Sequence, residues 1–263
     1  MSEAIATTPL KAIFRFPFQG PSSRDRFLIG SALIFAGTVI PIVPTIFVYG
    51  YTLQIMQQAI KGQDLTLPAW DDWGKFGVDG LRGIVVNLVY VLPGLIVSIA
   101  GMAIYFFSSL AFPLMLGAAE QGRGEELVIP MMMMFFVSFG IMMLALFLGS
   151  LLSLLGVLWL PMATAHFMAQ DKLAAAFRVR EWWRLLRTNW LGYLISLVIS
   201  AGLIAVLYIG IMLAYYTICL CCLVPLIAAP IGFYLSLVSA ALFGQTYRES
   251  VTLLEAKSET TSS

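Results

Sequence analysis

The sequence predicts an all-α polytopic membrane protein, built from three helical hairpins with amphipathic interfacial helices. Three observations predict this fold class. Of the 263 residues, 60% are hydrophobic and only 11% are charged, whereas a soluble domain carries about 25% charged residues. The mean hydropathy is +0.92. Apolar runs long enough to cross a bilayer, which takes about 20 residues, alternate with short polar stretches that hold almost all the charges.

The apolar runs contain no Asp, Glu, Lys or Arg, and they cover residues 27–49, 84–116, 128–168, 190–218 and 223–243. They correspond to about five to six membrane helices, the first of which becomes re-entrant if Pro41 and Pro44 break it. We expect one transmembrane domain over residues 11–248. The polar ends, 1–10 and 249–263, are rich in Ser, Thr and Glu, which predicts disordered tails.

Two layouts of the crossings compete. In the first, run 27–49 crosses once and run 128–168 crosses twice. Lys61, Lys75 and Arg82 then lie outside with all other basic residues inside.

In the second layout, residues 27–61 form a short hairpin, runs 84–116 and 128–168 form a long one, and residues 190–247 form a third. Only Arg123 then lies outside, so the positive-inside rule favours this layout. It predicts a multi-pass protein of the cytoplasmic membrane with both termini in the cytoplasm. Its difficulty is length, because run 128–168 as one helix measures roughly 60 Å, about twice the hydrocarbon core.

The stretch 172–190 is predicted to form an interfacial helix. Its apolar face carries Trp182 and Trp183, and its other face carries Arg180, Arg184 and Arg187. A Trp-bearing face beside a basic face is typical of a helix in the headgroup layer. We expect these residues to contact lipid, and the arginines to favour anionic headgroups.

The stretch 67–83, "LPAWDDWGKFGVDGLRG", is a second predicted interfacial helix that starts after Pro68. Trp70 and Trp73 are expected to anchor it at the lipid interface. Its charged face alternates in sign, and the pairs neutralise one another at helical spacing; this face comprises Asp72, Lys75, Asp79 and Arg82. Asp71 and Asp72 alone supply too few ligands for a cation site.

The chain resembles the prokaryotic integral-membrane family catalogued as domain of unknown function 4013, from about Leu28 to Tyr247. The matching pieces are Gly50-Tyr51, Gly62, Leu67-Pro68, Asp72-Trp73-Gly74, Asp79-Gly80-Leu81, Tyr90, Leu92-Pro93, Leu160-Pro161, Ala175-Ala176-Phe177, Tyr234 and Gly244-Gln245-x-Tyr247. The apolar run that ends at Pro161 is longer than the family's usual segment. The resemblance implies an α-helical membrane protein and supplies no reaction.

Candidate catalytic and metal-binding residues are scarce. His166 is the one histidine, and a lone histidine at the interface is most often structural; catalytic zinc usually needs three protein ligands. The sulfur-rich pieces Met131–Met134 and Cys219–Cys222 suggest Cu(I), but Met and Cys more often fill apolar space. A disulfide between Cys219 and Cys222 is a further interpretation of this segment. We expect no catalytic, cofactor or metal residues.

A stripe of small residues is expected to pack the last helix closely against a neighbour, within the chain or in an oligomer or partner complex. It recurs every four positions and comprises Ala228, Gly232, Ser236, Ala240 and Gly244. The run 128–168 repeats the pattern with Ala145, Gly149 and Ser153.

Together these features predict a non-enzymatic integral membrane protein that acts as a scaffold or assembly factor through lipid or protein contacts. Its expected partners are anionic lipid and a second copy or another membrane protein, and the net charge of +1 gives no sign of nucleic-acid binding. The alternative is a transporter or channel for a small apolar or lipid-like solute, with a cavity lined by Asn87 and Tyr90. Proton-coupled transport is disfavoured because the apolar runs carry no Asp, Glu, Lys or Arg.

Overall fold

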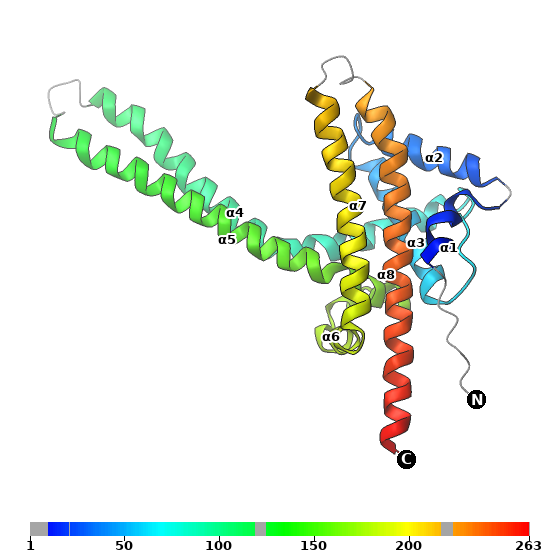
Figure 1. The fold of residues 1–263 in the computed structure, drawn as a ribbon. Coiled ribbons are helices and arrows are strands. Elements are labelled where there is room, and N and C mark those ends of the chain that lie inside the picture. The colour runs from blue at the N-terminus through cyan, green and yellow to red at the C-terminus, as the bar shows by residue number, and fades with distance from the viewer. Residues whose placement is uncertain (1–9, 21, 119–124, 217–222, 263) are drawn as a thin grey trace. The chain divides into compact units, whose positions relative to one another are not determined.

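The computed structural model describes residues 10–20, 22–118, 125–216 and 223–262, and every regular element in these ranges is helical (Figure 1). The elements in chain order are α1 (Leu10–Arg15), the 3-10 turn η1 (Phe16–Phe18), α2 (Ser23–Ala36), α3 (Val43–Ile60), α4 (Trp73–Ala118), α5 (Glu125–Gln170), the 3-10 turn η3 (Leu173–Phe177), α6 (Val179–Thr188), α7 (Trp190–Tyr216) and α8 (Val224–Ser262).

Four helices of the described chain are long and apolar enough to cross a membrane, and they lie within α4, α5, α7 and α8. The all-α polytopic membrane fold is therefore confirmed. The expected count of five to six differs because of the first apolar run. There α2 has 14 residues, about 21 Å of helix, which is too short to span the hydrocarbon core.

The structure divides into two compact units. Unit 1 comprises Met1–Val86 and Pro161–Ser263, and unit 2 comprises Asn87–Leu160. In unit 1, α8 is the central helix, because α1, α2, α3, α6 and α7 all pack against it. Phe233 of α8 and Tyr51 of α3 are fully buried there, with their rings 5.8 Å apart.

Unit 2 is a hairpin of α4 and α5 in which small residues let the two backbones meet. A Cβ on Gly149 would lie 2.1 Å from Ser98 Oγ, and a Cβ on Gly94 would lie 2.3 Å from the Gly149 carbonyl oxygen. The expected Ala145–Ser153 stripe therefore packs within the chain. The run 128–168 is part of one uninterrupted helix, α5, as the second layout requires.

Two glycines bring α3 and the start of α4 into direct backbone contact. A Cβ on Gly50 would lie 1.8 Å from the carbonyl oxygen of Phe76, and a Cβ on Gly80 would lie 1.9 Å from that of Ile46. No other residue fits such a crossing, because real Cβ atoms do not approach oxygen this closely.

The stretch 67–83 differs from its expected form. The helix begins at Trp73 rather than after Pro68, because Asp72 Oδ1 accepts the backbone N–H of Lys75 at 3.0 Å and caps α4. Residues 67–70 precede the helix and pack on α3, with Trp70 stacked on Tyr51 at 4.1 Å.

The two predicted tails have different outcomes. Residues 1–9 lie outside the described residues, and Leu10 begins α1. The predicted disorder over 249–263 is wrong as far as Ser262, since α8 continues to that residue. The reason is that a long helix already exists at Arg248, and extending it needs no new nucleus.

Candidate functional site

The helix α6 joins two of the candidate membrane-spanning helices. It follows the end of α5 at Gln170 and the turn η3, and it precedes α7, which begins at Trp190. Asn189 separates α6 from α7, and its Oδ1 accepts the backbone N–H of Gly192 at 3.2 Å, so Asn189 caps α7.

The apolar face of α6 points into unit 1. Trp182 and Leu186 are each only 1% exposed, and α6 packs on α7 and α8. The indole N–H of Trp182 donates to the carbonyl oxygen of Ala176 at 3.1 Å. The expectation that Trp182 contacts lipid is therefore wrong: the helix buries this ring against its own chain because six residues upstream the turn η3 offers it an acceptor.

The opposite face of α6 is a row of exposed arginines, Arg180, Arg184 and Arg187. We call these three residues the arginine row. Within the described part of the chain, none of the three is in an ion pair. The guanidinium of Arg187 lies over the Trp183 ring, 5.1 Å from its centroid, which is a cation–π arrangement. The row therefore presents three uncompensated positive charges to its surroundings.

Of the other tryptophans predicted to contact lipid, one is buried in the protein and two are partly exposed. Trp70 is 9% exposed, and its indole N–H donates to the carbonyl oxygen of Arg26 at 2.9 Å. Its predicted lipid contact is also wrong, because the ring is held between α2 and α3. Trp73 is 40% exposed and Trp183 is half-buried, so their lipid contact stays a prediction.

A buried hydrogen-bond network lies beside α6 and is centred on His166 of α5, which is 3% exposed. Its Nε2 lies 3.1 Å from Glu181 Oε2 of α6, and its Nδ1 lies 2.8 Å from the hydroxyl of Tyr247 of α8. The amide nitrogen of Gln170 lies 2.9 Å from the same Nε2. The network therefore ties three helices together at one imidazole.

The charge at the edge of this network belongs to Glu181. The hydrogen bond from His166 is the largest cause that lowers the pKa of this carboxyl; partial desolvation opposes it, and Gln170 and Arg178 support it. Arg178 donates to the other carboxylate oxygen at 3.4 Å. Glu181 is thus ionised at neutral pH and faces the imidazole.

Sequence reasoning singled out His166 alone, as a structural residue, and missed its partners. The pair His166 and Gln170 has the spacing i, i+4, which puts both on one helix face. Glu181 and Tyr247 lie 15 and 81 residues from His166, and only the docking of α6 and α8 on α5 brings them together. The position of Glu181 as the only acidic residue in α6 is the one signal in the sequence that marks it.

The small-residue stripe of α8 is not one continuous contact. A Cβ on Gly244 would lie 2.6 Å from the carbonyl oxygen of Met56 of α3, whereas a Cβ on Gly232 would meet nothing within 4 Å. Ala240 is buried and Ser236 is half-buried. A four-residue spacing drifts around an α-helix by about 40° per step, so the two ends of the stripe face different neighbours.

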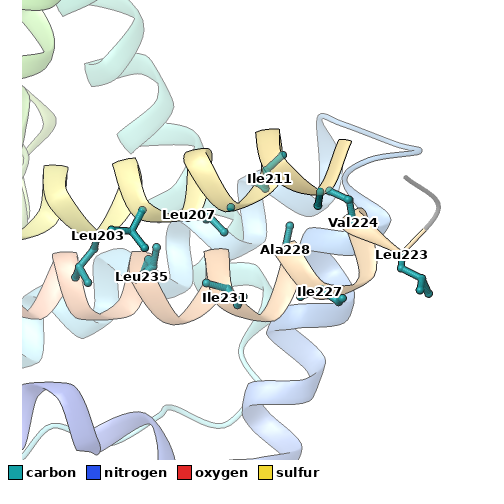
Figure 2. A pocket seen from close by; sticks show the side chains of 12 residues that line it. Leu203, Leu207, Ile211, Leu223, Val224, Ile227, Ala228, Ile231 and Leu235 are labelled. Carbon is teal, nitrogen blue, oxygen red and sulfur yellow. The ribbon is translucent and has the colours of Figure 1, made fainter. Parts of the chain in front are cut away.

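Ala228, the first residue of that stripe, instead lines an apolar cavity of about 350 Å³ between α7 and α8 (Figure 2). Its wall is formed only by aliphatic side chains and glycine, among them Leu203, Leu207, Ile231 and Leu235. Asn87 and Tyr90, the residues expected to line a solute cavity, belong to unit 2 and are not part of this wall. The sulfur-rich segment 219–222 lies outside the described residues, and within them no three His, Cys, Asp or Glu side chains gather as for a metal ion.

Comparison with known proteins gives one result. No curated protein and no solved structure matches the chain. A family model described as "Protein of unknown function (DUF4013)" matches residues 33–216. This range contains α3, α4, α5, α6 and α7 in full, and with α6 it contains the arginine row. The chain therefore belongs to the DUF4013 family of proteins of unknown function.

Proposed function

We propose that this protein is a non-enzymatic integral membrane protein that binds anionic lipid through the arginine row of α6 and organises the surrounding membrane or a partner there. The observation that carries the proposal is the division of α6 into two faces. Trp182 and Leu186 fix the helix to unit 1, and the three arginines on the other side are exposed and outside any described ion pair.

Rigid attachment makes the row a better headgroup site than a flexible basic segment. Because α6 is packed on α7 and α8, its backbone need not be ordered when a lipid binds, and binding avoids that part of the entropic cost. Guanidinium groups also form bidentate hydrogen bonds with phosphate oxygens. The chemistry of the row therefore fits phosphate-bearing, negatively charged headgroups.

The proposed site lies on the cytoplasmic side of the cytoplasmic membrane, with both chain termini on that side. Ser196, near the start of α7, hydrogen-bonds to Thr246 of α8 at 2.7 Å. The arginine row and the C-terminal part of α8 therefore lie at the same end of the α7–α8 hairpin. This common end supports an arrangement in which the basic row and the C-terminus share one face of the membrane.

The test is lipid binding by native mass spectrometry of the full-length protein in mild detergent. Phosphatidylglycerol is compared with phosphatidylcholine, for wild type and for the triple variant Arg180→Gln, Arg184→Gln, Arg187→Gln. Each basic residue near an anionic surface contributes about 1 kcal/mol, so the triple variant should weaken phosphatidylglycerol binding by roughly two orders of magnitude. Phosphatidylcholine binding should change little.

A matched control removes the same charge elsewhere. Lys11, Lys61 and Lys257 are exposed and dispersed over unit 1, and their joint substitution by Gln should leave phosphatidylglycerol binding close to wild type. Equal loss in both triple variants would reduce the effect to net charge and contradict a site on α6. The same spectra report whether the protein is a monomer, a homo-oligomer or bound to another membrane protein.

A second candidate function, handling of a lipid-like solute, is favoured by the aliphatic cavity between α7 and α8. Its wall suits a hydrocarbon chain rather than a polar solute. Flux of a fluorescent lipid in proteoliposomes tests it, with Ala228→Leu as the variant that fills the cavity. Flux equal to that of empty vesicles would exclude this function.

A further inference from the structure

We propose that the cavity between α7 and α8 holds one acyl chain of a phospholipid from the leaflet opposite the arginine row. The inference deepens the second candidate function, because it names the occupant of the cavity. It rests on the proposed function for its orientation alone. With the arginine row on the cytoplasmic side, the chain belongs to a lipid of the outer leaflet.

The cavity lies where small side chains leave space between α7 and α8. Gly210 and Ala214 of α7 and Ala228 of α8 line it, and a Cβ on Gly210 would meet nothing within 4 Å. Nearer the start of α7 the two helices are in contact, since Ser196 hydrogen-bonds to Thr246 at 2.7 Å. A polar contact therefore closes one end of the pair, and the cavity occupies the other.

The cavity has a buried floor and an exposed rim. Val224 and Leu235 are buried at its floor, whereas Val206, Ile227 and Ile231 on its rim are exposed. Leu235 and Ile231 of α8 lie beside α7 in Figure 2. Both helices are long and apolar enough to span a membrane, so the open side faces lipid tails. An acyl chain can therefore enter from the side.

The position of the cavity matches one leaflet of a bilayer. Its wall begins at Leu203, the middle residue of α7, and reaches Ala214, two residues before the end of that helix. The helix between them is about 16 Å long, and one leaflet contributes about 15 Å of hydrocarbon. Because α6 precedes the other end of α7, this leaflet is the one remote from the arginine row.

The end of α7 carries the aromatic residues expected at a membrane–water boundary. Tyr215 and Tyr216 follow the cavity directly, and both are exposed. Tyrosine is enriched at this level of a bilayer, where its ring meets lipid and its hydroxyl meets water. A lipid whose chain fills the cavity would thus have its headgroup beside these two residues.

The size of the cavity favours an acyl chain over a helix of a partner protein. A helix about 16 Å long and about 10 Å wide fills more than about 1,000 Å³, whereas the cavity holds about 350 Å³. The wall consists of 12 residues, fewer than the roughly 20–30 that each side of a stable protein interface supplies. A hydrocarbon chain is narrower, and it needs only the aliphatic contacts that this wall provides.

The wall offers nothing that would recognise a charged headgroup. The sequence from Leu203 to Leu235 contains no Asp, Glu, Lys, Arg or His. Binding in the cavity should therefore be equal for phosphatidylcholine and phosphatidylglycerol, whereas the arginine row should prefer phosphatidylglycerol. This difference separates the two lipid sites by experiment.

The test is photo-crosslinking of the full-length protein in phosphatidylcholine vesicles. The probe is phosphatidylcholine with a diazirine midway along one acyl chain, and mass spectrometry locates the labelled peptides. Labelling of residues 203–214 and 223–235 is divided by labelling of residues 87–111 of α4, whose exposed side chains report ordinary lipid contact. For wild type this ratio should be about three or more, because a chain in the cavity is contacted on several sides.

Two glycines of α7 give a matched pair of variants. Gly210 and Gly202 both have open space around them, but Gly202 is not part of the wall and is turned by about 80° around the helix axis. Gly210→Leu places a side chain in the cavity and should lower the ratio to about one. Gly202→Leu should keep the wild-type ratio. Ala228→Leu fills the cavity from α8 and replaces Gly210→Leu if that variant does not fold.

Three results would overturn the proposal. They are a wild-type ratio no higher than that of α4, an equal loss of labelling in the two glycine variants, and stronger labelling by the phosphatidylglycerol form of the probe. If the wild-type cavity is unlabelled and Gly210→Leu breaks up a homo-oligomer, the occupant is a second copy of the chain instead.

The outcome is independent of the test of the arginine row. The triple arginine variant should keep the wild-type labelling ratio, so the proposed function can fail in the phosphatidylglycerol measurement while the cavity is still labelled. Labelling without lipid flux in proteoliposomes would keep the bound lipid and exclude the handling of a solute.

Discussion

The crossing of α3 and α4 gives the sharpest mutational prediction. In Gly50→Ala the new Cβ would lie 1.8 Å from the Phe76 carbonyl oxygen and 2.9 Å from the Gly80 nitrogen. Both obstacles are backbone atoms and cannot rotate away. The two helices must therefore separate by more than about 1 Å to restore ordinary packing distances. The separation also disturbs Tyr51, the next residue, which stacks on Trp70.

The magnitude follows from two opposing effects. Overpacking of this kind costs about 1–3 kcal/mol, and the rigid backbone obstacle favours the upper end of that range. Replacing glycine by alanine in a helix returns about 1 kcal/mol. We expect a net loss of about 2 kcal/mol, which for a chain of this size lowers the apparent Tm by roughly 4–8 °C. The assay is thermal unfolding in detergent, followed by tryptophan fluorescence at a fixed heating rate.

The control is the same substitution where the structure leaves space. Gly232 also lies in a helix of unit 1, and a Cβ there meets nothing within 4 Å. Gly232→Ala should leave the apparent Tm unchanged or raise it by a few degrees through the gain in helix propensity. Equal Tm values for Gly50→Ala and Gly232→Ala would refute the close crossing.

Three further outcomes are expected from the same thermal assay or its pH variation. Gly149→Ala should destabilise the α4–α5 hairpin by about 1–3 kcal/mol, whereas Gly140→Ala, with open space around it, should not; equal behaviour would contradict the hairpin contact. Trp70→Phe leaves the carbonyl oxygen of Arg26 without its indole donor and should cost about 1–3 kcal/mol, and an unchanged Tm would return this ring to a lipid-anchor role. The pKa of the Glu181 carboxyl is lowered in the folded chain, so the stabilisation it contributes is complete above the pKa of this carboxyl in the unfolded chain and disappears as pH falls through its folded-state pKa. Below about pH 4, wild type should therefore lose more stability than Glu181→Gln. Parallel acid profiles of the two proteins would contradict this prediction.

The sequence alone predicted the fold class, the hairpins and the family. Those features depend on composition and on the length of apolar runs, which are local properties: a bilayer imposes helices on any such run. The Gly149 stripe was also predictable, because small residues at helical spacing have few other uses in a hydrophobic helix. The single long helix α5 was expected from the distribution of basic residues, although its length counted against it.

Only the tertiary structure decided which face of each amphipathic segment meets protein. Trp182 and Trp70 lie in sequence patterns typical of lipid anchors. Both rings are nevertheless buried, and their indole N–H groups donate to the backbone carbonyl oxygens of Ala176 and Arg26. A tryptophan suits a lipid interface and a protein core for the same reason, a large apolar ring with one donor, so the pattern cannot separate them. The network of His166 with Glu181 and Tyr247 was hidden for a related reason: its members are distant in sequence, and the hydrogen bonds exist only once α6 and α8 have packed on α5.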